Sequence, residues 1–257
     1  MTYHPYSKQS LFSKQSLFTH HASHITSYMS FLFLWVSASQ AALYNSTYSS
    51  GFANSGNIPD ANPTGWADTR TLTGITDFSI SDVSVSLNVA GGYNGDLYAY
   101  LSYNGVLVPL LNRVGVAASS PSSSFGYSNP GFNITLSDSG ANDVHFYGRN
   151  NPNFNGSGQL IGNWQADGRN INPNSSPASF DSANRVTFGS YDNLNPNGSW
   201  TLFIADMAAG DQSQVLSWSL NIEAVPEPVN AALAIFGAVL LGCWMWRSLR
   251  VREGTGI

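Results

Sequence analysis

The residue best suited to transfer a proton in this sequence is His145. The chain contains five histidines, and the other four all lie near its start, at His4, His20, His21 and His24. A Ser-His-Asp triad needs a histidine as its general base, and no Gly-x-Ser-x-Gly, His-Glu-x-x-His or phosphate-loop motif accompanies His145. Abundant aspartates leave a paired-carboxylate hydrolase formally open, but their abundance does not place two in one cleft. We interpret His145 as structural, with a polar tip in water, and expect no enzyme.

Some aspartates suit calcium instead. Asp96 follows a Gly-rich turn, and Asp206 and Asp211 bracket a loop. Carboxylates and loop carbonyls are the ligands that Ca²⁺ uses, although no EF-hand spacing occurs. The same side chains could cap turns by accepting hydrogen bonds from backbone N–H groups. We favour capping, so we expect no cofactor and leave a structural calcium ion as the alternative.

Aromatic residues offer a third kind of chemistry, because sugars stack on exposed rings. Tyr93, Tyr98, Tyr100 and Tyr103 are the candidates. Tyr98 and Tyr100 could equally cover the outer face of a sheet, and we favour that interpretation. Exopolysaccharide therefore stays a possible partner.

Charge and cysteine content exclude several classes of protein. Five arginines stand against twelve aspartates and two glutamates between residues 42 and 228, a net charge of −9. No basic stripe exists to hold phosphates, so we expect no nucleic-acid binding. The single cysteine, Cys243, lies in an apolar run, which excludes a disulfide framework and a Cys-rich zinc site.

The elements that would position these residues are strands. Alternating apolar residues predict strands over 78–89, 96–103, 106–111, 132–136, 200–205 and 216–222, with short candidates at 144–147 and 186–188. The alternation slips by one residue after Ser81-Asp82, as a β-bulge would produce. Asn104-Gly105 predicts a hairpin turn. Short strands joined by Gly, Asn and Pro predict an all-β antiparallel sandwich or jelly roll, with long surface loops over 148–184.

The first 41 residues look like an export leader. A short apolar run from Met29 ends in Ser39-x-Ala41, and signal peptidase admits only small side chains at those two positions. The run is too short to span a bilayer. We predict cleavage after Ala41, with either Met1 or Met29 as the true start. Residues 42–74, rich in Gly and Pro, are then expected to form an irregular polar segment, with room for one edge strand, before a sandwich over 75–224.

The last residues, 225–257, look like a sorting tail. Val225-Pro-Glu-Pro228 should end the sheet, because each proline removes a ladder donor. The apolar run 229–246 predicts a transmembrane helix of roughly 27 Å, with Trp244 and Trp246 at the lipid boundary. The basic residues after it would stay cytoplasmic and place the β domain outside.

This tail resembles the PEP-CTERM sorting signal. The resemblance rests on the tripeptide, the apolar helix and the terminal arginines together, namely Pro226, Glu227, Pro228, Arg247, Arg250 and Arg252. It implies recognition by an exosortase, a membrane-embedded cysteine protease-transpeptidase of Gram-negative bacteria that accompanies exopolysaccharide production. The arginines here are interrupted and the chain continues to Ile257, which puts the efficiency of processing in doubt.

The β domain resembles the proprotein-convertase P domain (P/Homo B). Gly95-Asp96-Leu97 leading a strand, and Trp200–Asp206 followed by Gly210-Asp211 and Leu216–Leu220, carry this resemblance. It covers roughly residues 75–222 and implies a jelly-roll sandwich, which elsewhere lies beside subtilisin-like catalytic domains.

These observations together predict a non-catalytic exported protein. It would cross the inner membrane of a Gram-negative bacterium, be anchored there, and be sorted by an exosortase to the cell surface or the extracellular matrix of a biofilm. A glycan-binding module for host exopolysaccharide is one alternative. The other is an accessory P domain of a subtilisin-like serine protease system.

Overall fold

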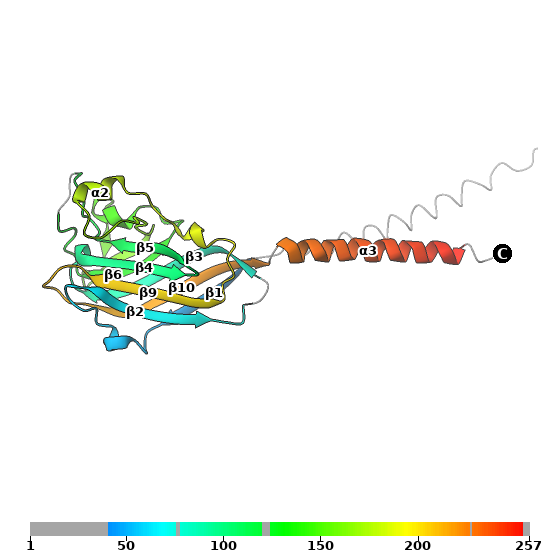
Figure 1. Ribbon diagram of the computed structural model, residues 1–257, viewed down its shortest axis with the longest axis horizontal. Coiled ribbons are helices and arrows are strands. Elements are labelled where there is room, and N and C mark those ends of the chain that lie inside the picture. Colours follow the sequence, from blue (N-terminus) through cyan, green and yellow to red (C-terminus); the bar gives the residue numbers. More distant parts are fainter. Residues whose placement is uncertain (1–40, 76–77, 120–123, 227, 254–257) are drawn as a thin grey trace, which may run out of the picture. The chain divides into compact units, whose positions relative to one another are not determined.

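Two β-sheets make up the folded part of the chain (Figure 1). A computed structural model describes residues 41–75, 78–119, 124–226 and 228–253. One compact unit comprises Gln40–Glu227. The six-stranded sheet has the order β1-β10-β3-β6-β8-β7, and the four-stranded sheet has the order β2-β9-β4-β5. The prediction of an all-β sandwich is thereby confirmed.

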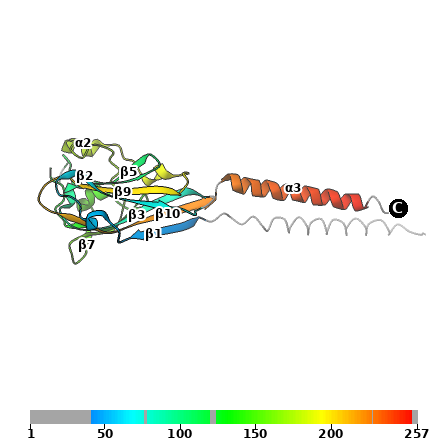
Figure 2. The same ribbon diagram turned by 60° about the horizontal axis from the view of Figure 1, so that its bottom comes forward.

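The larger sheet is built from segments far apart in the sequence, and Figure 2 shows β1 and β10 side by side. Its strands are β1 (Ala42–Tyr48), β3 (Phe78–Gly91), β6 (Gly131–Ser137), β7 (Asn153–Phe154), β8 (Leu160–Trp164) and β10 (Ser213–Pro226). The smaller sheet consists of β2 (Asn62–Leu72), β4 (Leu97–Tyr103), β5 (Val106–Asn112) and β9 (Gly198–Asp206). Short helices fill the connections: η2 (Ala53–Gly56), η3 (Asn94–Asp96), η4 (Val144–Arg149), α2 (Pro177–Ser182) and η5 (Phe188–Tyr191).

One hydrophobic core lies between the sheets, and the alternation in the sequence sets its members. Strand β4 buries every second residue, and so do β9 from Trp200 to Ile204 and β10 from Trp218 to Ala224. Trp200 and Trp218 are 0% and 1% exposed, as predicted from their phase. The Tyr103 ring stacks on Trp200 with 3.9 Å between centroids, so Tyr103 belongs to the core.

Two local predictions are confirmed by the strand register. Between β3 and β10 the register shifts, because Glu223 faces Asp82 while Ala224 faces Ile80, which leaves Ser81 as a bulge. Asn104 and Gly105 both have positive φ, 48° and 78°, and they connect β4 to β5 as a tight hairpin.

Residues 42–74 form two edge strands, where the sequence predicted an irregular segment with room for one. They supply β1 to one sheet and β2 to the other, and each is an edge strand. Edge strands tolerate proline and irregular backbone, because one side of the ladder is free. Strand β2 contains Pro63, and Gly65 at φ +60° lies where its register with β9 shifts.

The short strands predicted at 144–147 and 186–188 are also wrong. Residues 144–147 belong to helix η4. Residues 186 and 187 lie in no strand, and Phe188 is the first residue of helix η5. The expected loop region 148–184 contains β8, which pairs with β6 in parallel. This pairing adds one parallel ladder to a sheet that was expected to be wholly antiparallel.

Helix α3 (Pro228–Glu253) begins where the prolines were expected to end the sheet. Its most exposed apolar side chains include Leu233, Phe236, Leu241 and Trp244. Across the described residues, no helix is long and apolar enough to cross a membrane. The transmembrane helix expected over 229–246 is therefore not found among these residues.

Replacing Trp218 by alanine should lower the free energy of unfolding by about 3–5 kcal/mol, because the change leaves a large cavity in the core. Urea unfolding followed by circular dichroism measures this. Leu216→Ala is the control, because this neighbour on β10 is 42% exposed and its loss should change little. Equal stability of the two variants would contradict the core assignment.

Candidate functional site

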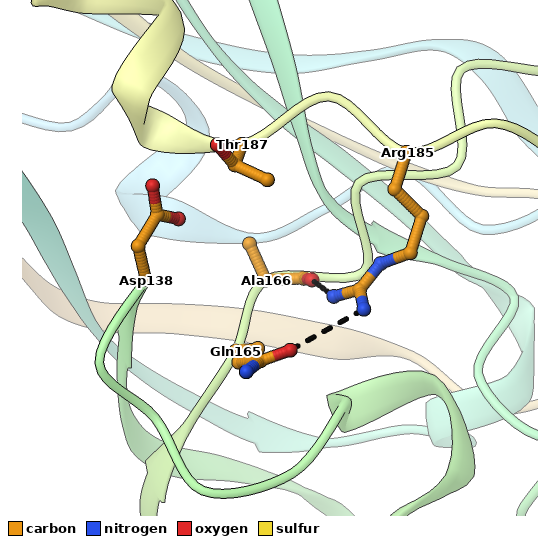
Figure 3. A pocket seen from close by; sticks show the side chains of 5 residues that line it. All are labelled: Asp138, Gln165, Ala166, Arg185 and Thr187. Atoms are coloured by element: carbon orange, nitrogen blue, oxygen red, sulfur yellow. Dashed lines mark hydrogen bonds between the residues drawn. The ribbon is translucent and has the colours of Figure 1, made fainter.

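A pocket of about 230 Å³ opens where the long connections of the sandwich meet (Figure 3). One wall follows β6, another follows β8, and the third belongs to the segment between α2 and η5. The connections there are rich in Asn, Gly and Ser. Hydrogen bonds from side chains, and not hydrogen bonds between strands, therefore hold the backbone of these connections in place. The pocket is lined by Asp138, Gln165, Ala166, Arg185 and Thr187.

Arg185 supplies the positive charge of the pocket. Figure 3 shows its guanidinium pointing to Gln165 and Ala166. Nη1 donates to Gln165 Oε1 at 3.3 Å, Nη2 donates to the Ala166 carbonyl at 2.6 Å, and Nε donates to the Asp167 carbonyl at 2.9 Å. The side chain is 30% exposed, so these bonds hold a cation at the rim.

Asp138 supplies the opposite charge. Its carboxylate accepts from the N–H groups of Phe188 at 3.1 Å and Gly189 at 2.8 Å, which fixes the start of η5. Burial and the nearby Asp138 also raise the pKa of Asp192. A carboxylate and a guanidinium on separate walls suit a small polar ligand. Neither is paired with a nucleophile, and none of the five lining residues is a histidine or cysteine.

Behind the pocket lies the histidine singled out by the sequence. His145 is 0% exposed, so the expectation of a polar tip in water is wrong. Its Nδ1 lies 2.7 Å from Asp167 Oδ2, and its Nε2 lies 2.9 Å from the Val116 carbonyl. Both neighbours are acceptors, so the ring satisfies both contacts only with a proton on each nitrogen. An imidazole held in this way has no free nitrogen to accept a proton from a nucleophile.

Asp167 is the centre of this buried network. It also accepts from the Asn112 N–H at 3.1 Å, and Arg169 Nη1 lies 3.2 Å from its Oδ1. Burial alone would raise the pKa of Asp167, but His145 and Arg169 outweigh burial and hold the pKa below its usual range. The carboxylate of Asp167 is therefore ionised, between His145 and Arg169.

Arg169 connects the network to its surroundings. Its Nη1 donates to Asp143 Oδ2 at 2.8 Å, and its Nε donates to the Phe180 carbonyl of α2 at 2.8 Å. Burial would lower the pKa of Arg169, but Asp167 and Asp143 raise it. A buried charge needs hydrogen-bond and ionic partners, and the Arg169 guanidinium has both Asp143 and Asp167.

Sequence reasoning found His145 but missed Asp143, Asp167 and Arg169. The available signal was weak. Asp167 and Arg169 are two apart, on either side of Gly168, whose φ of 69° is positive, so no strand periodicity marks them. Their meeting with residues near 145 depends on β8 lying beside β6, which the sequence did not indicate.

The predicted sorting and cleavage residues lie elsewhere. Pro226 ends β10 opposite Phe78, Pro228 begins α3, and Glu227 lies outside the described residues. Arg247 is exposed on α3, and Arg250 and Arg252 lie in its last turns. Ser39 also falls outside the described residues, whereas Ala41 directly precedes β1. The described ones are not among the residues that line the pocket.

The calcium candidates gather at another end of the sandwich. Asp206 Oδ1 accepts from the Ala208 N–H at 3.1 Å, which is the turn capping favoured above. Asp96 Oδ1 lies 3.6 Å from Arg113 Nη2. Within the described part of the chain, no group of three or more His, Cys, Asp or Glu side chains is arranged to hold a metal ion.

The tyrosines proposed for sugar stacking have other neighbours. Tyr98 and Tyr100 are half-buried on the outer face of the smaller sheet. Tyr100 stacks on Phe203 with 4.7 Å between centroids, and a Cβ on Gly65 would lie 2.6 Å from the Phe203 ring. The Tyr100 and Phe203 rings thus cover each other, and the Phe203 ring lies close to the backbone of Gly65.

Comparison with known proteins identifies no family. No family model matches the chain, and no curated protein matches it. Some solved structures resemble it distantly, and two of them are serine protease structures. A serine protease of Aeromonas sobria in complex with its chaperone has a TM-score of 0.41 and 12% identity, covering 77% of this chain and 29% of the solved one. The same organism's serine protease alone has a TM-score of 0.40 and 13% identity, covering 77% and 30%. The chain spans about three tenths of those chains, and similarity at this level assigns no function.

Replacing His145 by alanine should destabilise the domain by about 3–5 kcal/mol, because it leaves the buried Asp167 carboxylate without the His145 contact. Combining His145→Ala with Asp167→Ala tests the pairing. The double variant should lose clearly less than the sum of the two single losses, as measured by urea unfolding. Additive losses would show that the two side chains do not act as a pair.

Proposed function

We propose that this chain is a non-catalytic, exported protein of the cell surface or extracellular matrix. A leader carries it across the inner membrane of a Gram-negative bacterium, and an exosortase-type system processes its C-terminal tail. One observation carries the proposal: the compact unit, Gln40–Glu227, fills the interval between the two predicted processing segments.

The N-terminal boundary supports this proposal. Cleavage after Ala41 would leave Ala42 as the first residue, and Ala42 is the first residue of β1. Strand β1 pairs with β10 along its whole length, from Ala42 opposite Ala224 to Tyr48 opposite Trp218. Signal peptidase would therefore release the folded unit with its edge strand intact.

The C-terminal boundary supports it as well. Pro226 is the last residue of β10 and Pro228 is the first residue of α3, so the tripeptide lies at the junction of strand and helix. In the proposed protein the sandwich is a P-domain-like jelly roll, and the tail is the recognised element. The geometry of His145 supports a non-catalytic role, because both its ring nitrogens are engaged and it is fully buried.

Glu227→Ala, made in the native host, should leave the protein as its unprocessed full-length form, because it removes the only charge of the tripeptide. Glu223→Ala is the matched control: it is the same chemical change four residues earlier, at an exposed position on β10. Immunoblots of fractionated cells measure the size and location of each form.

Normal processing of Glu227→Ala and of a triple alanine variant at 226–228 would refute exosortase sorting. The non-catalytic part has a separate test. Peptidase activity in the purified protein that a folded His145→Gln variant lacks would overturn it.

A further inference from the structure

The described strands β1, β7, β2 and β5 form the edges of the two sheets. An edge strand presents a row of unpaired N–H and C=O groups, to which another strand can bind. Folded proteins block such edges with very short strands, prolines, charges, irregular backbone or a covering segment. The edges of this protein differ in whether they have such a block.

Two edges are blocked by their own sequence. Strand β7 consists of only two residues, Asn153–Phe154. Strand β2 contains Pro63, which has no N–H to donate, and its register with β9 is interrupted between Asn62 and Trp66. Neither strand offers a long regular row of backbone groups.

The edge at β5 is covered by the segment that follows β8. The Asp167 N–H donates to the Leu110 carbonyl at 3.1 Å. The Gly168 N–H donates to the Pro109 carbonyl at 2.9 Å. The carbonyl groups of this edge are therefore already used within the protein.

Strand β1 has none of these blocks. Its seven residues, Ala42–Tyr48, include no charged residue, proline or glycine. It pairs with β10 along its whole length without a shift in register. Among the described residues, no strand or isolated bridge pairs with its other side, which lies at the border of the larger sheet (Figure 2). This edge is the one most open to a further strand.

The side chains of β1 suit a second copy of the same strand. Leu43, Asn45 and Thr47 are exposed on the outer face of the sheet. The Asn45 amide donates to the Asn221 side-chain oxygen, and its own oxygen accepts from the Thr47 hydroxyl at 3.3 Å. A primary amide has two N–H donors and two acceptor positions, so one of each remains. The same amide on a second copy can both accept from this group and donate to it.

We propose that two copies of this chain associate through β1, which pairs antiparallel with β1 of the partner subunit about a two-fold axis. Alternate residues of a strand direct their N–H and C=O groups to the same side, so the axis must pass between two copies of one residue. An axis at Asn45 uses all seven residues of the strand. It places Asn45 opposite the partner's Asn45, and Leu43 opposite the partner's Thr47, and it joins two six-stranded sheets into one.

The positions of the charges are compatible with this dimer, although the chain has a net charge of −5. Glu223 lies on β10 opposite Leu43. The two Glu223 carboxylates would lie on strands that are three spacings apart, about 14 Å, which exceeds the screening length of about 8 Å at physiological ionic strength. Arg70, whose guanidinium lies over the Tyr48 ring, is paired with Asp68 at 2.8 Å. The two copies of β1 therefore meet without like charges in contact.

Asn45→Lys in the full-length protein tests the pairing, because it places two ammonium groups opposite each other across the axis. The dissociation constant of the dimer should rise at least about tenfold, since like charges that face each other across an interface are strongly unfavourable. Sedimentation velocity over a range of about 1 to 100 μM measures it. Asn133→Lys is the matched control, the same change at an exposed position on β6. Association through the exposed apolar side chains of α3 would be the same in both variants.

A mixture of two variants separates lost pairing from lost structure. Asn45→Lys and Asn45→Glu should each associate weakly when alone. Mixed in equal amounts, they should associate at least as tightly as the wild type, because opposite charges then face each other across the axis. A defect in the folding of β1 would not be repaired by mixing.

Cysteine cross-linking tests the register, in a Cys243→Ser background that removes the single native cysteine. Asn45→Cys should give a disulfide-linked dimer under mild oxidation, because opposite Cβ atoms lie about 4.5–5.5 Å apart. Thr47→Cys is the matched control on the same face of β1. It should give no such dimer, because the two copies of this position are offset by four residues, roughly 14 Å.

The cross-linking variants keep the proposal testable if Asn45→Lys does not fold. Equal cross-linking of the two positions, or none at Asn45→Cys, would overturn the dimer. An association that Asn45→Lys leaves unchanged would also overturn it. Occupation of β1 by a different protein, or by another part of the same chain, would give no cross-linked dimer at Asn45→Cys and so counts against the proposal.

Discussion

The hydrogen bond between the Trp218 indole and the Asp68 carboxylate connects the two sheets across the core. Trp218 lies on β10 and Asp68 on β2, and Nε1 donates to Oδ2 at 2.7 Å. Arg70 Nε donates to the same oxygen at 2.8 Å, and its guanidinium lies over the Tyr48 ring of β1 at 4.7 Å. Because a buried carboxylate requires donors, this arrangement fixes which face of β2 turns inward and closes the β1–β2 side of the sandwich.

The opposite side is closed by different means. Between β6 and β9 the chain contributes only the short strands β7 and β8 and several single-turn helices. Few hydrogen bonds between strands form on that side. The buried ion pairs and hydrogen bonds around Asp167 and Arg169 connect η4, α2 and the segment after β8 instead. The pocket of Figure 3 is the outer surface of this arrangement, because Arg185 donates both to its wall and to the Asp167 carbonyl.

The parts that could be predicted from the sequence depend on neighbours along the chain. Alternation placed Trp200 and Trp218 in the core, a slip in phase located the bulge at Ser81, and Asn104-Gly105 gave the hairpin. The parts that failed depend on distant partners. Strand β2 was obscured by Pro63 and Gly65, which are tolerated only because it is an edge. Strand β8 can pair only after β6 has joined the sheet, because β6 is its partner. The burial of His145 depends on the same pairing, which brings Asp167 to it.

The pairing of β1 with β10 has a mechanical consequence. The strands are antiparallel, and Ala42 lies opposite Ala224, so both ends of the folded unit leave the sheet at the same end. A force that pulls these ends apart acts across the strands. It would break the hydrogen bonds between β1 and β10 one residue pair after another, starting at Ala42 and Ala224. A force applied along the strands would have to break the whole ladder together. The unit therefore resists tension poorly when it is held by both ends, and an attachment through β10 alone leaves β1 unloaded.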